Sequence, residues 1–354
     1  MSLRKLKSML MIAAVAIAAA SCKDDDEVEY KYLDGSLTFD LPEFITPGET
    51  LTMTPRGISH PDDEAIGYYW KVTPTMAKYD TTKFLTGLDA SGKPSDGSLT
   101  HKFSDTLQTY TVNCYGYAEG YTASSKSNYT TVVSPGPEKS ITGTGIAEGD
   151  PFIEANGHVY HYTTVGKLDW FRTDLAYTNS GLPFRNSEAM DGVFGRYYSY
   201  EEAINACPEG WRLPTDADWA ALGAAFDSSD DDASVYVRQN IPGVAAKLLA
   251  DAYFNGFKMW EYWPSLGKIN NESRIGMIPT GYVNFGEKDK NGAYPTATFI
   301  GEYEYATYWT ADKDEEKSNI AYFRYVYCKY PDLMLGKADT KTFGAAVRCV
   351  RDVI

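Results

Sequence analysis

The chain has 354 residues and carries 48 Asp and Glu side chains against 33 Lys and Arg, so its formal net charge at pH 7 is −15. A chain this acidic lacks the basic surface that neutralises phosphates, which excludes nucleic acid as an expected partner. The length suggests roughly two domains, and the 28 tyrosines favour β-rich structure with many half-buried rings.

The first residues are typical of an exported protein. Basic side chains near the start precede an apolar run at residues 9–20, which is too short to span a bilayer as a folded helix. Small residues then precede Cys22, and residues 24–27 are all acidic. This arrangement resembles the lipobox of bacterial lipoproteins. The acidic run resembles the signal that sends Bacteroidetes lipoproteins to the outer face of the outer membrane.

The resemblance implies a signal peptide at residues 1–21, acylation of Cys22 and localisation at the cell outer membrane, facing the extracellular side. An ordinary secretory signal that contains a chance cysteine is the alternative. Cleavage removes three of the 33 basic side chains and none of the 48 acidic ones, which leaves a net charge of −18. Anionic head groups repel such a chain, so we expect the lipid to anchor it through an acidic tether at residues 22–29.

Residues 30–134 are predicted to form a β-sandwich. Short segments of alternating apolar and polar residues are separated by Pro, Gly and Asp clusters; they lie at residues 36–40, 49–54, 66–73, 99–103, 110–117 and 128–133. The pattern around Trp70 and residues 110–114 resembles immunoglobulin-like (Ig-like) and polycystic-kidney-disease-type (PKD-like) domains of surface proteins. Cys114 has no second cysteine upstream in this domain, so we expect a buried thiol there.

A break at Ser134-Pro135-Gly136-Pro137 predicts a linker over residues 135–145 and a second domain over residues 146–354. Two capping boxes mark helices in that domain: Ser199 with Glu202 begins one over residues 200–207, and Thr215 with Asp218 begins another over 216–226. We also expect a short helix at residues 244–250 and strands near residues 275–284, 306–310, 320–327 and 345–351.

A long motif in this second part carries a second resemblance. Residues 207–219 read Cys-Pro-Glu-Gly-Trp-Arg-Leu-Pro-Thr-Asp-Ala-Asp-Trp, and residues 347–352 read Val-Arg-Cys-Val-Arg-Asp. Together they resemble the Fibrobacter succinogenes major paralogous domain. Further matching stretches lie at residues 166–175, 195–200, 278–282 and 308–310.

The Arg-Leu-Pro-Thr stretch also resembles sulfatase-modifying-factor and C-type-lectin-like folds. The resemblance implies an irregular α+β domain with two helices, small antiparallel sheets and long loops. It further implies a disulfide between Cys207 and Cys349, with two buried thiols as the alternative. Asp174 stands where the family more usually has Asn, so this chain has a carboxyl group in place of that amide.

The sequence offers no complete catalytic or metal site, so we expect no enzyme, no cofactor and no metal. A formylglycine-generating oxidase needs two cysteines in its site, and only Cys328 lies in the relevant region. An incomplete calcium loop from Glu287 ends at Thr298, which cannot supply a bidentate carboxylate. His158 and His161 are three residues apart, a spacing that points to opposite faces of a strand.

Aromatic residues are the predicted ligand-binding surface. Rings can stack on sugar faces or anchor a protein partner. The predicted members are Trp260, Tyr262, Trp263, Tyr305, Tyr308 and Trp309. The alternative is that these rings fill gaps between the loops of an irregular domain. Along residues 322–327 two faces alternate: one carries Tyr322, Arg324 and Val326, and the other carries Phe323, Tyr325 and Tyr327. One face is expected in the core and the other at the surface.

The leading hypothesis is a non-catalytic surface lipoprotein that captures a glycan or peptide, as an accessory to a TonB-dependent nutrient importer in the outer membrane. The alternatives are an adhesin or structural protein that binds host or cell-surface proteins, and a divergent enzyme. Tryptophans exposed in a concave groove with polar neighbours would favour a glycan, whereas a flat apolar patch would favour a protein partner.

Overall fold

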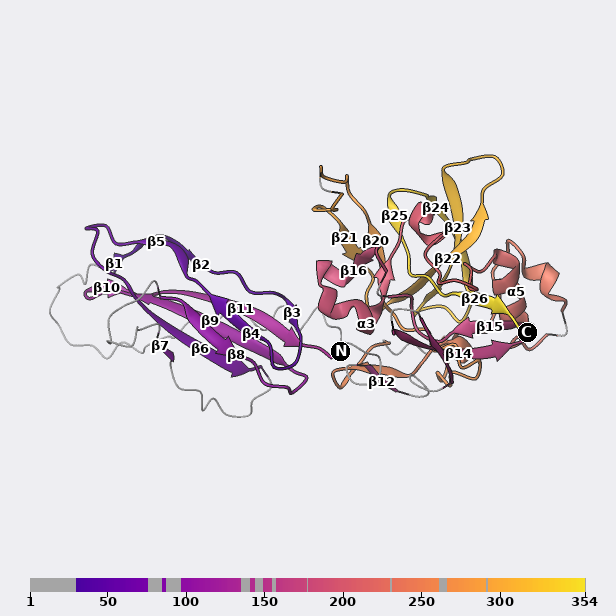
Figure 1. Cartoon of the computed structure of the whole chain (residues 1–354), viewed down its shortest axis with the longest axis horizontal. Coiled ribbons are helices and arrows are strands. Elements are labelled where there is room, and N and C mark those ends of the chain that lie inside the picture. The colour runs from indigo at the N-terminus through magenta and orange to yellow at the C-terminus, as the bar shows by residue number, and fades with distance from the viewer. Residues whose placement is uncertain are drawn as a thin grey trace, which may run out of the picture.

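The computed structural model describes residues 30–75, 85–86, 97–134, 141–143, 149–154, 157–176, 178–229, 231–260, 266–290 and 292–353. Cys22, the predicted signal peptide and the tether lie outside these residues. The chain forms two lobes that follow one another along its long axis (Figure 1). Both are rich in strands arranged in several sheets, as expected. Among the described residues, no helix is long and apolar enough to cross a membrane.

The N-terminal lobe consists of strands. Its largest sheet has the order β3-β11-β9-β6-β7, and the pairs β2–β5, β4–β8 and β1–β10 form two-stranded ribbons. The strands are β1 (Lys31–Tyr32), β2 (Asp34–Thr38), β3 (Phe44–Ile45), β4 (Thr50–Met53), β5 (Arg56–Ser59), β6 (Gly67–Pro74), β7 (Leu85–Thr86), β8 (Leu99–Lys102), β9 (Thr109–Tyr117), β10 (Tyr121–Thr122) and β11 (Ser124–Val132).

One hydrophobic core lies between the large sheet and the ribbons. Trp70 from β6 is fully buried and its indole nitrogen donates a hydrogen bond to the Gly97 carbonyl at 2.7 Å. Val112 and Cys114 from β9 lie on the same buried side, as the alternation predicts. Burial raises the pKa of the Cys114 thiol to about 12, so it stays protonated and packs as a small apolar side chain.

The C-terminal lobe combines small sheets with short helices. Its sheets have the orders β13-β14-β15-β26, β22-β23-β24, β21-β20-β25, β12-β18-β19 and β16-β17. The strands are β12 (Ile141–Gly143), β13 (Asp150–Ile153), β14 (Val159–Val165), β15 (Leu168–Phe171), β16 (Leu182–Pro183), β17 (Arg196–Tyr197), β18 (Ala252–Phe254), β19 (Phe257–Lys258), β20 (Tyr282–Asn284), β21 (Thr298–Ile300), β22 (Tyr305–Lys313), β23 (Ile320–Tyr327), β24 (Met334–Asp339), β25 (Phe343–Gly344) and β26 (Val350–Asp352). The helices are α3 (Asp191–Phe194), α4 (Tyr200–Ala203), α5 (Asp216–Ala224) and α6 (Ala245–Leu248), with 3-10 turns η1 (Phe184–Asn186), η2 (Glu188–Met190) and η3 (Ala233–Tyr236).

The boundary between the lobes differs from the predicted linker. Ile141–Gly143 form β12 and pair with β18 of the C-terminal lobe, so these residues already belong to that lobe. Ile141 is buried in a cluster that also holds Phe44 and Val133 of the N-terminal lobe. Asn255 donates a hydrogen bond across the boundary to the Val132 carbonyl at 3.1 Å. The two lobes therefore share a packed contact.

Both predicted capping boxes are confirmed. Ser199 and Glu202 exchange side-chain and backbone hydrogen bonds at the start of α4, and Thr215 and Asp218 do the same at the start of α5. Both helices are shorter than predicted. α4 ends at Ala203, after which the chain continues in turns toward Pro208, because a proline and Gly210 follow so closely.

The protonation of the Asp218 carboxylate makes the stability of the α5 capping box depend on pH. Burial raises its pKa, but hydrogen bonds from Arg212 (2.6 Å) and Thr215 (2.7 and 2.8 Å) outweigh burial and hold the pKa below its usual value. A carboxyl with a depressed folded pKa stabilises the fold above about pH 4, and this contribution is lost as the pH falls through the folded pKa.

We therefore expect Asp218→Asn to lower the free energy of unfolding by about 1 kcal/mol at pH 6. The difference from the wild type should shrink at pH 3, where the wild-type carboxyl also becomes protonated. Urea unfolding of both proteins at the two pH values measures this difference in the free energy of unfolding. A difference that grows as the pH falls would contradict the assignment.

Candidate functional site

Of the four predicted ligand-binding aromatic residues that the structure describes, three do not lie at the surface. Trp260, Tyr308 and Trp309 are 1%, 0% and 0% exposed, so the prediction that they form a contact surface is wrong for these three. Trp309 packs inside one core cluster and donates its indole N–H to the Tyr198 carbonyl at 2.7 Å. Tyr262 and Trp263 lie outside the described residues.

Tyr305 lies at the start of β22 and is half-buried. Its ring contacts a larger group of aromatic rings. In the antiparallel register, Tyr305 lies opposite Tyr327, and Thr307 lies opposite Tyr325. These residues share one side of the sheet, because side chains alternate along each strand. Arg324 and Val326 point to the other side and are fully buried. That second side therefore faces the core, whereas the side with Tyr305 is buried at Thr307 and Trp309 and partly exposed at its other rings.

We call the partly exposed rings on this side the aromatic face. It comprises Tyr282, Tyr305, Phe323, Tyr325, Tyr327, Tyr330 and Phe343. Tyr305 and Tyr327 stack with centroids 4.3 Å apart and planes 7° from parallel. Phe323 and Phe343 stack at 4.7 Å, and Tyr330, which is 51% exposed, lies 5.6 Å from Tyr327. The rings thus form one continuous group.

The surroundings of the aromatic face leave room for one ring and set the protonation state of another. Gly336 on β24 lies under Phe323, and a Cβ there would stand 2.2 Å from that ring. Thr307 is 1% exposed, and its hydroxyl has no hydrogen-bond partner among the residues that the structure describes. Burial, followed by the neighbouring Tyr327, raises the pKa of Tyr305, so its hydroxyl stays protonated at neutral pH and can donate a hydrogen bond.

Only part of the aromatic face could be predicted from the sequence. The alternation of Phe323, Tyr325 and Tyr327 predicts one partly exposed side of a strand, which the structure confirms. Tyr282 and Phe343 reach the same group only because β20 and β25 pair with one another. No local pattern predicts that pairing.

Asp174 forms a buried ion pair with Arg348. Its carboxylate accepts a hydrogen bond from Arg348 at 2.5 Å, and both side chains are almost fully buried. Arg348 also donates to the carbonyls of Phe171, Ile275 and Gly276. Burial raises the pKa of Asp174, and Arg348 opposes that shift. This pair ties the motif at residues 347–352 to the segment after β15.

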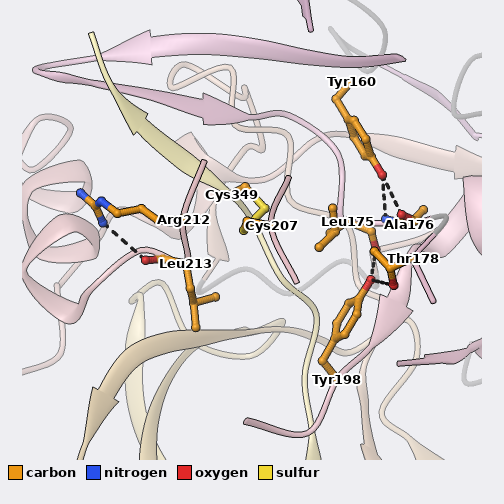
Figure 2. The surroundings of a disulfide bond; sticks show 9 residues. All are labelled: Tyr160, Leu175, Ala176, Thr178, Tyr198, Cys207, Arg212, Leu213 and Cys349. Carbon is orange, nitrogen blue, oxygen red and sulfur yellow. Dashed lines mark hydrogen bonds between the residues drawn. A yellow bond between two sulfur atoms is a disulfide. The ribbon is translucent and has the colours of Figure 1, made fainter. Parts of the chain in front are cut away.

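The predicted disulfide joins Cys207 to Cys349 (Figure 2). Cys207 follows α4 and Cys349 directly precedes β26, so the bridge links the two motifs that carry the resemblance. Nearby, Arg212 donates to the Leu213 carbonyl at 3.4 Å and the Tyr160 hydroxyl donates to the Ala176 carbonyl at 2.7 Å. Cys328 is a buried thiol. Within the described parts of the chain, no group of three or more His, Cys, Asp or Glu side chains could hold a metal ion.

Comparisons with known proteins agree with the motif. The family model of the Fibrobacter succinogenes major domain matches residues 154–351. No curated protein matches the chain. Among solved structures, a superoxide reductase (neelaredoxin) from Ignicoccus hospitalis matches with a TM-score of 0.22 and 9% identity, over 31% of this chain and 86% of that one. That likeness is too low to carry an argument. Because the family model matches more than half of the chain, the protein belongs to the Fibrobacter succinogenes major domain family.

Proposed function

We propose that this protein is a non-catalytic, surface-exposed binding protein that captures a glycan on the aromatic face. The observation that supports this proposal is the continuous group of partly exposed rings on β22, β23 and the neighbouring segments. Ring faces stack on the C–H faces of sugars, and such contacts order few side-chain torsions. Most members are tyrosines, which add hydroxyl donors and acceptors around the apolar faces.

The chemistry of the face favours a glycan over an apolar protein surface. Tyrosine is enriched at protein interfaces as well, but the hydroxyls of the five tyrosines on the aromatic face also suit a ligand that is itself covered with hydroxyl groups. Lys329, whose amine lies 5.4 Å from the Tyr327 ring centroid, adds a charged donor at the margin. Binding of a protein partner is the alternative function and is an outcome of the experiment below.

The proposed setting follows from the first residues and the family. The signal peptide, acylated Cys22 and acidic tether would place the protein on the outer face of a Bacteroidetes-type outer membrane. There an Ig- or PKD-like N-terminal domain would present a C-type-lectin-like C-terminal domain. The role as an accessory to a TonB-dependent importer rests on this location, and co-purification of the lipoprotein with a transporter from mild detergent tests it.

A glycan array with the full-length lipoprotein in detergent tests the binding function. Tyr325→Ala combined with Tyr327→Ala is expected to lower affinity for any retained glycan at least tenfold, because it removes stacking worth more than about 1.4 kcal/mol. Tyr117→Ala is the matched control, since Tyr117 is a 46% exposed tyrosine on the N-terminal lobe.

Retention of the glycan by the double variant would place the binding site elsewhere. Failure of the wild type to bind any glycan, together with saturable binding of a purified protein partner, would replace the proposal with the adhesin function. Near-UV circular dichroism of each variant distinguishes loss of the site from loss of the fold.

A further inference from the structure

A cavity of about 400 Å³ that several charged side chains help to line lies in the C-terminal lobe and shares no lining residue with the aromatic face. Residues before and within β14, the segment after β15 and α3 line it. Both His158 and His161 contribute, although their spacing predicts opposite faces. His158 precedes β14, which begins at Val159, so strand alternation does not apply to it. The fold thereby brings two imidazole-bearing residues to one cavity.

Small residues leave the space open. Gly157, Gly192, Gly195 and Gly276 all line the cavity. Gly195 has a φ of +71°, and a Cβ there would stand 2.7 Å from the Asp174 Cβ, so no other residue fits without displacing the wall. A volume of this size falls in the range that holds one small organic ligand.

The carboxylates of the cavity are already matched by guanidinium groups. Asp174 pairs with Arg348 at 2.5 Å. Asp191, which is 6% exposed, accepts two hydrogen bonds from Arg196 at 2.9 and 2.6 Å in a bidentate pair. These carboxylates are therefore poorly placed to attract a cation.

Donors dominate the remaining lining. Arg172 lines the cavity, is 3% exposed and is positioned by the hydrogen bond from its Nε to the Arg274 carbonyl at 2.7 Å. His158, His161 and Thr173 are partly accessible and add further hydrogen-bonding groups. The lining itself holds two guanidinium groups, of Arg172 and Arg348, and two carboxylates, each of which already accepts hydrogen bonds from an arginine. Because both carboxylates are matched, the donors that remain at the cavity favour a ligand that brings its own carboxylate.

We propose that this cavity binds the carboxylate of a small organic acid, with the imidazoles of His158 and His161 as the accessible recognition groups. The size of the cavity and its donors fit either a sugar acid or the carboxylate of an amino acid. The inference goes beyond glycan capture on the aromatic face, because it rests on different residues.

Titration calorimetry of the full-length lipoprotein tests it with matched probes. Glucuronate is compared with glucuronamide, and N-acetylalanine with N-acetylalaninamide, which separates the sugar-acid and amino-acid sources. We expect one acid to bind at least tenfold more tightly than its own amide. His158→Gln combined with His161→Gln should lower that affinity at least tenfold, whereas His101→Gln on the N-terminal lobe and Tyr327→Ala on the aromatic face should leave it unchanged.

Equal affinity for acid and amide, no saturation by either acid at 10 mM, or full retention by the folded double histidine variant would each overturn the proposal. Thermal unfolding of the double variant shows whether it is folded. Glycan capture on the aromatic face can survive each of these results, so the two proposals fail separately.

Discussion

Replacing Asp216 with alanine is expected to lower the free energy of unfolding of the C-terminal lobe by about 3–5 kcal/mol. Asp216 begins α5 and accepts a hydrogen bond from the Arg324 Nε at 2.7 Å, and the side chains are 1% and 0% exposed. Without the carboxylate, a guanidinium remains buried with no ionic partner. The cost of an uncompensated buried charge is what makes the expected effect large.

Several other hydrogen bonds belong to the same network. Asp216 accepts the backbone N–H of Arg238 at 2.6 Å, while its own N–H donates to Asp312 at 2.6 Å. Arg324 donates to the Gln239 carbonyl at 2.5 Å and the Tyr236 carbonyl at 2.9 Å. Burial lowers the pKa of Arg324, and the hydrogen bond to Asp216 opposes that shift. The network therefore ties the start of α5 to β23, the strand that carries the aromatic face.

Guanidinium chloride unfolding followed by near-UV circular dichroism measures the effect. Asp312→Ala is the control for removal of a carboxylate in the same network, and we expect a smaller loss because that side chain is 28% exposed. Asp216→Ala combined with Arg324→Met should recover part of the stability, because it also removes the buried charge. A loss below about 1 kcal/mol for Asp216→Ala would show that water or a rearranged neighbour solvates Arg324.

Local chemistry explains which parts of the fold could be predicted from the sequence. Ser199 with Glu202 and Thr215 with Asp218 satisfy orphan N–H groups within one turn, so their sequence is sufficient to place both helix starts. β23 runs from Ile320 to Tyr327, as expected from its alternation. By contrast, β24 (Met334–Asp339) contains Gly336 and charged residues and has a weak strand pattern. Its pairing with β23 is a tertiary effect.

The sites were harder to predict because burial depends on what packs from elsewhere. Trp309 is an aromatic residue in a strand whose pattern alone does not show whether it is buried, and Tyr200 and Phe343 pack against its ring and help to bury it. The cavity near His158 gathers residues from distant segments, among them Arg172 and Arg348. Composition indicates that such rings and charges exist but does not indicate which of them meet.

Removing the disulfide with Cys207→Ser and Cys349→Ser is expected to lower the free energy of unfolding by about 4 kcal/mol. The two cysteines are 142 residues apart, and a bridge across a loop this long strongly restricts the unfolded chain. Cys349 lies beside Arg348 and before β26, so the bridge closes the C-terminal segment onto the loop after α4. Most of that effect acts on the unfolded state, so the folded lobe should keep its near-UV spectrum.

Unfolding midpoints with and without a reducing agent separate the bridge from the substitutions. The wild type should lose stability on reduction, whereas the double serine variant should show no response, because the remaining described thiols, Cys114 and Cys328, are buried and form no bridge. The N-terminal lobe contains neither bridged cysteine, so its transition should shift less than that of the C-terminal lobe. An equal response of both proteins to the reductant would mean that the motif stabilises the lobe through packing alone. In that case Arg348, held by Asp174 and three backbone carbonyls, would remain as the contact that fixes the end of the chain.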